Sequence, residues 1–265
     1  MERRTWVILS LIFSVLSLVY ILMDYFGLIR YFRLHNASHG AYVKAYAGLD
    51  KADPDNRVVI SITTTPDGLS KIKPVLLSLI DQTVRVDEIA LNIPYAYQNA
   101  KMEKYEVPKY LEEIVNVYRS GKDYGKTTKV IPTMLRESGA KTKIIFLDDD
   151  MIYGKDFIED LVTASLNNKG DAIYVSGWNA NADVLRSRMG VLIEPNFVDA
   201  DIVKGTKLNT DADIWVSGHL KKRNTKAKKI EYTENYGAMG YRRQGQLPLT
   251  RREKIAQLKV FWPDA

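Results

Sequence analysis

Lys141-Thr142-Lys143-Ile144-Ile145-Phe146-Leu147 runs directly into Asp148-Asp149-Asp150, and this stretch decides the fold. The apolar run is typical of a buried strand. If the extended geometry continues through the acidic triplet, Asp148 and Asp150 lie on one side and Asp149 on the other. Two carboxylates on one side repel each other unless a cation is present, so the triplet predicts a site for a hard divalent metal. The alternative is a solvated acidic turn.

Strands and helices alternate on both sides of this stretch. A strand over residues 57–63 is followed by a helix with its apolar face at Ile72, Val75, Leu76, Leu79 and Ile80, for which Ser70 can be the cap. The alternation predicts an α/β domain with a mainly parallel central sheet that helices cover on both faces. The other predicted strands span 88–93, 114–118, 143–147 and 172–176, and the other predicted helices span 128–138, a segment opened by a capping box at 156–159, and a last segment opened by one at 250–253.

The chemistry of such a sheet is expected where its strands end. Ligands of parallel sheets bind beyond the carboxyl ends of the strands. Three strand exits carry polar or turn-forming residues, namely 63–66, 92–94 and 148–150. These exits are the predicted ligand site.

Composition limits the chemistry further. The chain has 265 residues and no Cys, which excludes disulfides, thiolate metal sites and a cysteine nucleophile. Its 38 Lys and Arg against 32 Asp and Glu give a net charge of +6, which favours anionic partners. The basic residues form no recognisable nucleic-acid-reading motif, so nucleic acid is not an expected partner.

Several motifs over residues 57–220 together resemble the nucleotide-diphospho-sugar-binding half of family-2-like GT-A glycosyltransferases. They are Thr63-Thr64-Thr65-Pro66 after the first strand, the segment 123–129, and Leu147-Asp148-Asp149-Asp150. The resemblance implies a GT-A-like three-layer α/β/α domain with Mn²⁺ or Mg²⁺ held by Asp148 and Asp150. It also implies a donor-nucleotide site formed by Thr63, Thr64, Thr65, Pro66, Asp67, Lys129, Asp148 and Asp149. The segment 123–129 departs from the family pattern at Lys126 and Thr127; its Gly125 precedes a helix start, where backbone N–H groups favour an anion.

A second acidic cluster lies at 209–220 and resembles the family's acidic pair at the start of the base-carrying helix. Ala212 stands where the first acid of the pair is usual, which aligns Asp213 with the second and leaves Asp211 one residue early. The resemblance implies that one carboxylate is the catalytic base of an inverting transfer; Asp213 is favoured, and Asp211 is the alternative. Either residue could instead be only a helix N-cap. Some GT-A enzymes use a late His as a metal ligand, but His219 lies six residues into this helix and is predicted to be a packing or surface histidine.

These observations predict a metal-dependent transfer of sugar from a nucleotide diphosphate donor to a hydroxyl of a glycan, a lipid-linked or another acceptor. Ala212 motivates an alternative, an inactive membrane-anchored binding module of the same fold. A nucleotidyltransferase is a third interpretation, because its metal and phosphate requirements overlap.

The amino-terminal segment predicts a membrane anchor. Residues 6–23 are eighteen consecutive uncharged residues, which as a helix reach about 27 Å, close to the thickness of a bilayer core. A cleaved signal peptide and a buried core helix are the alternatives. Basic residues flank both sides, so the charge rule favours neither orientation of a single-pass protein. We expect an anchor with its flanks at 1–34, a stalk at 35–56 and a catalytic domain at 57–265.

Overall fold

The computed structural model describes residues 2–25, 27–98, 104–137, 141–179, 183–232, 236–237 and 249–264. Contacts divide the chain into two compact units, Met1–Ser38 and His39–Ala265. The first unit contains helices α1 (Glu2–Tyr25) and α2 (Leu28–Asn36). The second contains all the strands and the remaining helices.

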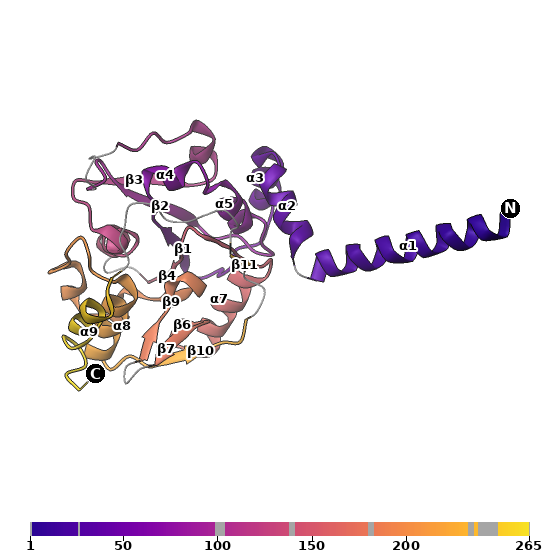
Figure 1. Cartoon of the computed structure of the whole chain (residues 1–265). Helices are drawn as coiled ribbons and strands as arrows, with labels where there is room; N and C mark the ends of the chain where they lie inside the picture. Colours follow the sequence, from indigo (N-terminus) through magenta and orange to yellow (C-terminus); the bar gives the residue numbers. More distant parts are fainter. Residues whose placement is uncertain are drawn as a thin grey trace. The chain divides into compact units, whose positions relative to one another are not determined.

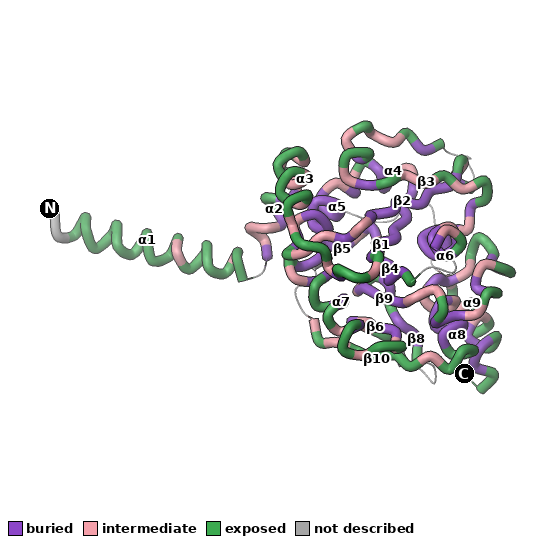
Figure 2. The backbone as a smooth tube through the Cα atoms, turned by 180° about the vertical axis from the view of Figure 1, so that it is seen from behind, coloured by how far each residue is buried: buried purple, intermediate pink, exposed green. Residues whose placement is uncertain are grey.

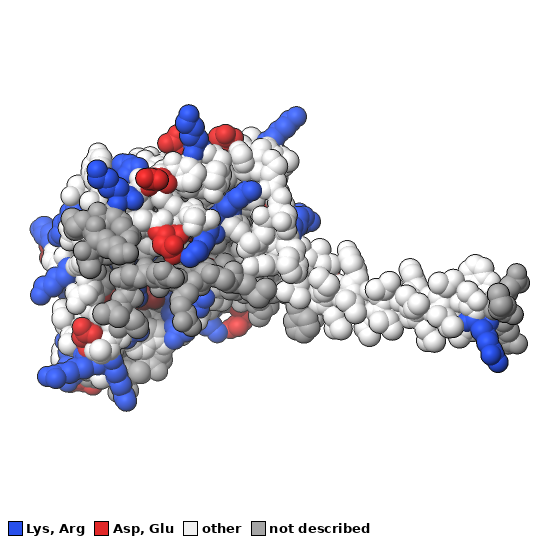
Figure 3. Space-filling view, turned by 45° about the horizontal axis from the view of Figure 1, so that its top comes forward, with Lys and Arg blue, Asp and Glu red and all other residues white. Residues whose placement is uncertain are grey.

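Helix α1 has the length and composition of a membrane span. The apolar segment within it is Arg4–Tyr25, 22 residues long. Figure 2 shows this helix as exposed along most of its length, and Figure 3 shows it as an uncharged rod with a basic side chain near its amino-terminal end. A signal sequence passes the same test, so a single-pass anchor stays the prediction.

A seven-stranded sheet in the order β10-β6-β9-β4-β1-β2-β3 forms the centre of the second unit (Figure 1). Its neighbouring strands are parallel except β9, which is antiparallel to both β4 and β6. The predicted α/β class with a mainly parallel sheet is therefore confirmed. The strands are β1 (Arg57–Ile62), β2 (Glu88–Pro94), β3 (Asn116–Ser120), β4 (Thr142–Phe146), β6 (Ala172–Tyr174), β9 (Val191–Ile193) and β10 (Ala227–Lys229).

Alternating side chains of the central strands bury both faces of this sheet. Ile144 and Phe146 pack with residues of α6 (Ile131–Arg136) and α8 (Ala212–Lys222) in one apolar cluster. Ile145 points the other way and is also fully buried. Helix α7 (Phe157–Asn167) contacts β6 and β9 without joining that cluster. The result is three layers with the sheet in the middle.

The segment just after helix α5 (Lys73–Ile80) is hydrogen-bonded to the beginning of α7. The side chain of Gln82, just after α5, accepts a hydrogen bond from the backbone N of Ile158 at 3.1 Å and donates one to the carbonyl of Gly154 at 2.6 Å. Gln82 is buried, so these two bonds satisfy an amide that would otherwise be costly to bury. They fix α5 against the beginning of α7.

Several local predictions need correction. The predicted helix at 128–138 is a 3₁₀ turn η2 (Gly125–Lys129) followed by the shorter α6. Strand β9 and the hairpin of β7 (Gly177–Asn179) and β8 (Asp183–Leu185) were not predicted, because strands of three residues are too short to show a period of two. Thr65, not Ser70, is a cap, and it caps the short α4 (Pro66–Leu69). Asp156 makes no capping bond to α7.

The segment predicted as a stalk contains helix α3 (His39–Ala47), which lies within the second unit and contacts α5. The hydroxyl of Tyr46 accepts a hydrogen bond from Val86 N at 2.8 Å, and Lys143 Nζ pairs with Asp53 at 2.5 Å in the interior. Residues 46–53 are thus bonded to the α/β unit, while the domain boundaries as such stay a prediction.

The remaining elements are short or peripheral. The capping box predicted at Thr250 and Glu253 is present and begins α9 (Arg251–Leu258). The others are the strands β5 (Met151–Ile152) and β11 (Tyr236–Gly237) and the 3₁₀ turns η1 (Lys109–Glu113), η3 (Ser187–Met189), η4 (Pro195–Phe197) and η5 (Ala200–Val203).

Candidate functional site

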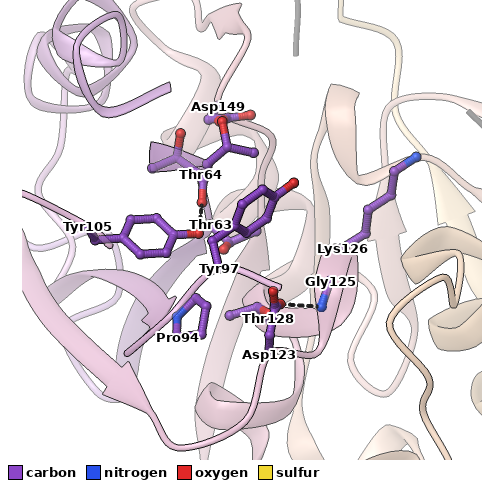
Figure 4. A pocket seen from close by; sticks show the side chains of 11 residues that line it. Thr63, Thr64, Pro94, Tyr97, Tyr105, Asp123, Gly125, Lys126, Thr128 and Asp149 are labelled. Atoms are coloured by element: carbon purple, nitrogen blue, oxygen red, sulfur yellow. Dashed lines mark hydrogen bonds between the residues drawn. The ribbon is translucent and has the colours of Figure 1, made fainter. Parts of the chain in front are cut away.

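A narrow pocket opens where β1, β2 and β4 end. Its lining includes the three strand exits that the sequence indicated: Thr63, Thr64 and Thr65 after β1, Pro94 at the end of β2, and Asp149 after β4 (Figure 4). The segment 123–128 and two tyrosines complete it. Parallel strands bring their carboxyl ends to one edge, which is why segments far apart in sequence meet here.

The two tyrosines restrict this pocket. The rings of Tyr97 and Tyr105 meet edge to face with centroids 6.2 Å apart, and the Tyr105 hydroxyl donates to the carbonyl of Thr64 at 3.0 Å. The cavity volume of about 20 Å³ is room for about one water molecule. A planar ring system would have to displace these side chains to enter.

The loop before η2 is held by Asp123. Its Oδ1 accepts from Gly125 N at 2.7 Å, and its Oδ2 accepts from Gln98 N at 2.9 Å. The N–H of Gly125 itself is therefore already bonded to Asp123. Gly125 has φ +59°, and a Cβ there would lie 1.9 Å from the carbonyl oxygen of Leu208. Only glycine fits this position without moving backbone.

The acidic triplet does not continue β4, because residues 149–150 form a turn. Its three side chains still differ in burial: Asp149 is fully buried, and Asp148 and Asp150 are partly exposed. Tyr153 supports the turn: its hydroxyl donates to the carbonyl of Asp148 at 2.9 Å and accepts from Asp148 N at 3.1 Å. Burial, reinforced by the nearby carboxylates, raises the pKa of Tyr153 well above its usual value, so the hydroxyl keeps its proton.

Lys129 joins the triplet to the second acidic cluster. Its ammonium group is buried, forms an ion pair with Asp148 Oδ1 and donates to Ser187 Oγ at 2.5 Å. Ser187 Oγ in turn donates to Asp213 Oδ1 at 2.5 Å, and Ser187 N donates to the same oxygen at 3.1 Å. A continuous chain of contacts therefore leads from the end of β4 to the first turn of α8.

Asp211 and Asp213 have different environments. Asp211 is the N-cap of α8, and its Oδ1 accepts from the backbone N of Asp213 at 3.1 Å and of Ile214 at 3.3 Å. The carboxylate of Asp213 points instead into the contacts with Ser187. Burial raises the pKa of Asp213 above its usual value, while Lys129 opposes that effect. A carboxylate with a raised pKa is better suited to accept a proton.

The carboxylates of the acidic triplet could bind a metal ion that is also bound by the phosphates of a ligand. Within the described part of the chain, no three acidic or histidine side chains gather around one point. Asp150 Oδ1 accepts from Arg188 Nε at 3.1 Å, and Asp148 pairs with Lys129. Mg²⁺ is commonly held by one or two carboxylates together with substrate phosphates, so Asp148 and Asp150 fit that mode and not a cage of protein ligands alone.

Only some of the residues predicted to bind the donor nucleotide line the pocket. Thr63, Thr64, Thr65 and Asp149 line the pocket, whereas Pro66 and Asp67 belong to α4 and do not. Asp67 forms an exposed ion pair with Lys71 at 2.8 Å. His219, predicted to be a packing or surface histidine and not a metal ligand, is buried, and its Nδ1 bonds to Asp199 Oδ2 at 3.0 Å.

Two contacting residues, Ser187 and Arg188, were not foreseen. They lie in η3, a three-residue turn between short strands. The sequence around them, Leu185-Arg186-Ser187-Arg188-Met189, shows neither periodicity nor a motif. The packing of β8 against α8 brings Ser187 to Asp213, and the next residue, Arg188, reaches Asp150 after β4.

Comparisons with solved structures find similarities in structure, and comparisons with sequences find none. No family model matches the chain, and no curated protein matches it. The crystal structure of GalNAc-T7 with UDP, GalNAc and Mn²⁺ is similar over 46% of this chain and 23% of that chain, with 18% sequence identity and a TM-score of 0.37. The chain thus spans less than a quarter of GalNAc-T7, and the reaction has to be inferred from the residues described above.

Proposed function

We propose that this protein is a glycosyltransferase that moves a sugar from a nucleotide diphosphate donor to an acceptor hydroxyl. The contact chain Asp148–Lys129–Ser187–Asp213 carries the proposal. It joins an acidic turn beside the pocket to a separate carboxylate with a raised pKa. Transfer to a hydroxyl needs both a group that manages the charge of the leaving diphosphate and a base for the acceptor proton.

The donor side would use the strand exits. Thr63, Thr64 and Thr65 would face the base of the nucleotide, and Tyr97 and Tyr105 would move to admit it. Asp149 is buried and lines this pocket, and the neighbouring Asp148 and Lys129 would meet the diphosphate. Lys129 supplies a fixed positive charge there, because burial and two hydrogen-bonding partners hold its ammonium group in place.

Asp148 and Asp150 would hold Mn²⁺ or Mg²⁺ together with the diphosphate. Such a metal neutralises the charge that develops on the departing diphosphate. Arg188, which pairs with Asp150, adds a second cation next to the triplet.

Asp213 would accept the proton of the acceptor hydroxyl. Both hydrogen bonds from Ser187 go to its Oδ1, and within the described residues its Oδ2 accepts none. Oδ2 is therefore the atom for proton transfer. A single carboxylate base fits the inverting transfer that the resemblance to family-2-like GT-A glycosyltransferases implies. The acceptor would be a glycan, a lipid-linked sugar or another hydroxyl compound near the membrane that α1 would span.

A product assay separates this function from its alternatives. The full chain in detergent would be incubated with a panel of nucleotide sugars, and in parallel with nucleoside triphosphates, with Mn²⁺ or Mg²⁺. Release of a nucleoside diphosphate from a nucleotide sugar supports glycosyl transfer. Pyrophosphate released from a triphosphate would indicate a nucleotidyltransferase instead. Nucleotide binding without either product would indicate a binding module.

A further inference from the structure

Ser187 occupies a constrained position between two elements. Strand β8 lies along α8, and Leu185 N donates to Ser217 Oγ at 2.9 Å, two residues before Ser187 contacts Asp213. Asp213 and Ser217 are four residues apart and so share one face of α8. The segment 185–187 is thus hydrogen-bonded to that face of α8 at two residues, Asp213 and Ser217, which lie one helical turn apart.

The direction of the hydrogen bonds through Ser187 is fixed by its partners. The Lys129 ammonium group can only donate, and an ionised Asp213 can only accept. The Ser187 hydroxyl therefore accepts from Lys129 and gives its single proton to Asp213 Oδ1. A hydroxyl polarised by a cation is a stronger donor than an isolated one.

This arrangement orients the carboxylate. Two donors from one residue, the hydroxyl and the backbone N, converge on Oδ1. They restrict rotation of the Asp213 carboxylate about its Cβ–Cγ bond and leave Oδ2 available for the acceptor proton. The side chain of Ser187 is nearly inaccessible, so no water can easily replace its hydroxyl.

We propose that Ser187 is a positioning residue, whose hydroxyl holds Asp213 with Oδ2 toward the acceptor and couples it to Lys129. This inference rests on the proposed function. It assigns a role in the reaction to a residue that lies outside every motif in the sequence. Removal of the hydroxyl should affect the transfer step more than donor binding, because the charged groups proposed to hold the donor, Asp148, Asp150 and Lys129, all stay in place.

The test compares Ser187→Ala with Ser187→Thr, which restores a hydroxyl. We expect Ser187→Ala to lower kcat about 10- to 100-fold with little change in the KM for the donor, and Ser187→Thr to recover most of that loss. Thr225→Val is the matched control: it also deletes one hydroxyl, which donates to Phe197 O at 2.5 Å away from the acids, and it should keep the wild-type kcat. Wild-type kcat in Ser187→Ala, or a loss that Thr does not recover, would overturn the proposal.

A second measurement does not depend on turnover. The groups that act on Asp213 are Lys129, Asp148, Asp211 and Ser187, and the Ser187 hydrogen bond lowers its pKa. Loss of a bond to the charged form raises a pKa, so the side-chain carboxyl ¹³C signal of Asp213 should titrate at higher pH in Ser187→Ala than in the wild type. An unchanged titration would contradict the coupling. Should the wild type turn over no donor, the proposed function fails, while this titration still decides whether Ser187 acts on Asp213.

Discussion

Asp211 and Asp213 have the same side chain, and the structure places them in different environments. Asp211 caps α8, so Asp211→Ala should lower the free energy of unfolding by about 0.5 to 2 kcal/mol. Asp211→Asn should cost much less, because Asn caps a helix about as well. Thermal unfolding of both variants measures the difference, and donor turnover should stay near wild type in Asp211→Asn. An inactive Asp211→Asn with an active Asp213→Asn would reverse the assignment of the base.

Asp150 offers a residue-scale test of the metal. Its carboxylate lies partly exposed at the triplet and pairs with Arg188. Asp150→Asn keeps the shape of the side chain and removes the charge that a divalent metal needs, so nucleotide affinity should lose its dependence on Mn²⁺. Calorimetric titration of the nucleotide with and without Mn²⁺ measures this. Asp67→Asn is the control, since Asp67 pairs with Lys71 in solvent. If Asp150→Asn kept the full Mn²⁺ dependence, the metal would have to bind elsewhere.

At the scale of the element, the loop at Gly125 connects the pocket to the segment before α8. A side chain there would meet Leu208 O and would require an unfavourable positive φ. Gly125→Ala should therefore lower the free energy of unfolding by about 2 to 4 kcal/mol and weaken nucleotide binding. Gly121→Ala is its control, because a Cβ at Gly121 would meet nothing within 4 Å and its φ is not positive. Chemical denaturation compares the two, and equal stabilities would contradict the account of this loop.

The elements also show how far the sequence determines the fold. Strands with five or more residues and one clear hydrophobic run, such as β1, β2 and β4, were predicted within one or two residues. Their exits correctly indicated the pocket, because chain direction in a parallel sheet places those exits together. Strand β9 was missed, since three apolar residues fit a strand and a buried helix segment equally well.

Residues of the candidate site could be predicted where they belong to a recognisable motif. They could not be predicted where only tertiary packing brings them to the site. Asp148 and Asp150 were indicated by the acidic triplet, and Asp213, with Asp211 as the alternative, by the resemblance at 209–220. Ser187 was not indicated, because its position between Lys129 and Asp213 exists only once β8 packs on α8. Pro66 and Asp67 show the opposite case: they belong to a matched motif, yet they begin α4 outside the pocket.

At the scale of the whole molecule, the apolar helix predicts a retained anchor. The segment Arg4–Tyr25 is long enough to cross a bilayer. The expressed full chain should stay in the membrane fraction after extraction with alkaline carbonate, which releases peripheral proteins. Replacing Leu11 and Leu16 by Arg should shift it to the supernatant, because charges at the centre of a span cost about 2.5 to 3.5 kcal/mol each. Mature protein that lacks this segment and appears in the supernatant would show a cleaved signal sequence instead.

In the proposed reaction, the acids after β4 serve the donor and Asp213 on α8 serves the acceptor. The decisive measurement is kcat for nucleoside diphosphate release in the presence of acceptor, together with the donor dissociation constant, for the wild type and Asp213→Asn. Removal of a general base typically costs a factor of about 10² to 10⁴ in rate. We predict a loss of that size with donor affinity unchanged within about twofold, since Asp148 and Lys129 are intact. Full transfer activity in Asp213→Asn, or a loss explained by weaker donor binding, would contradict the account.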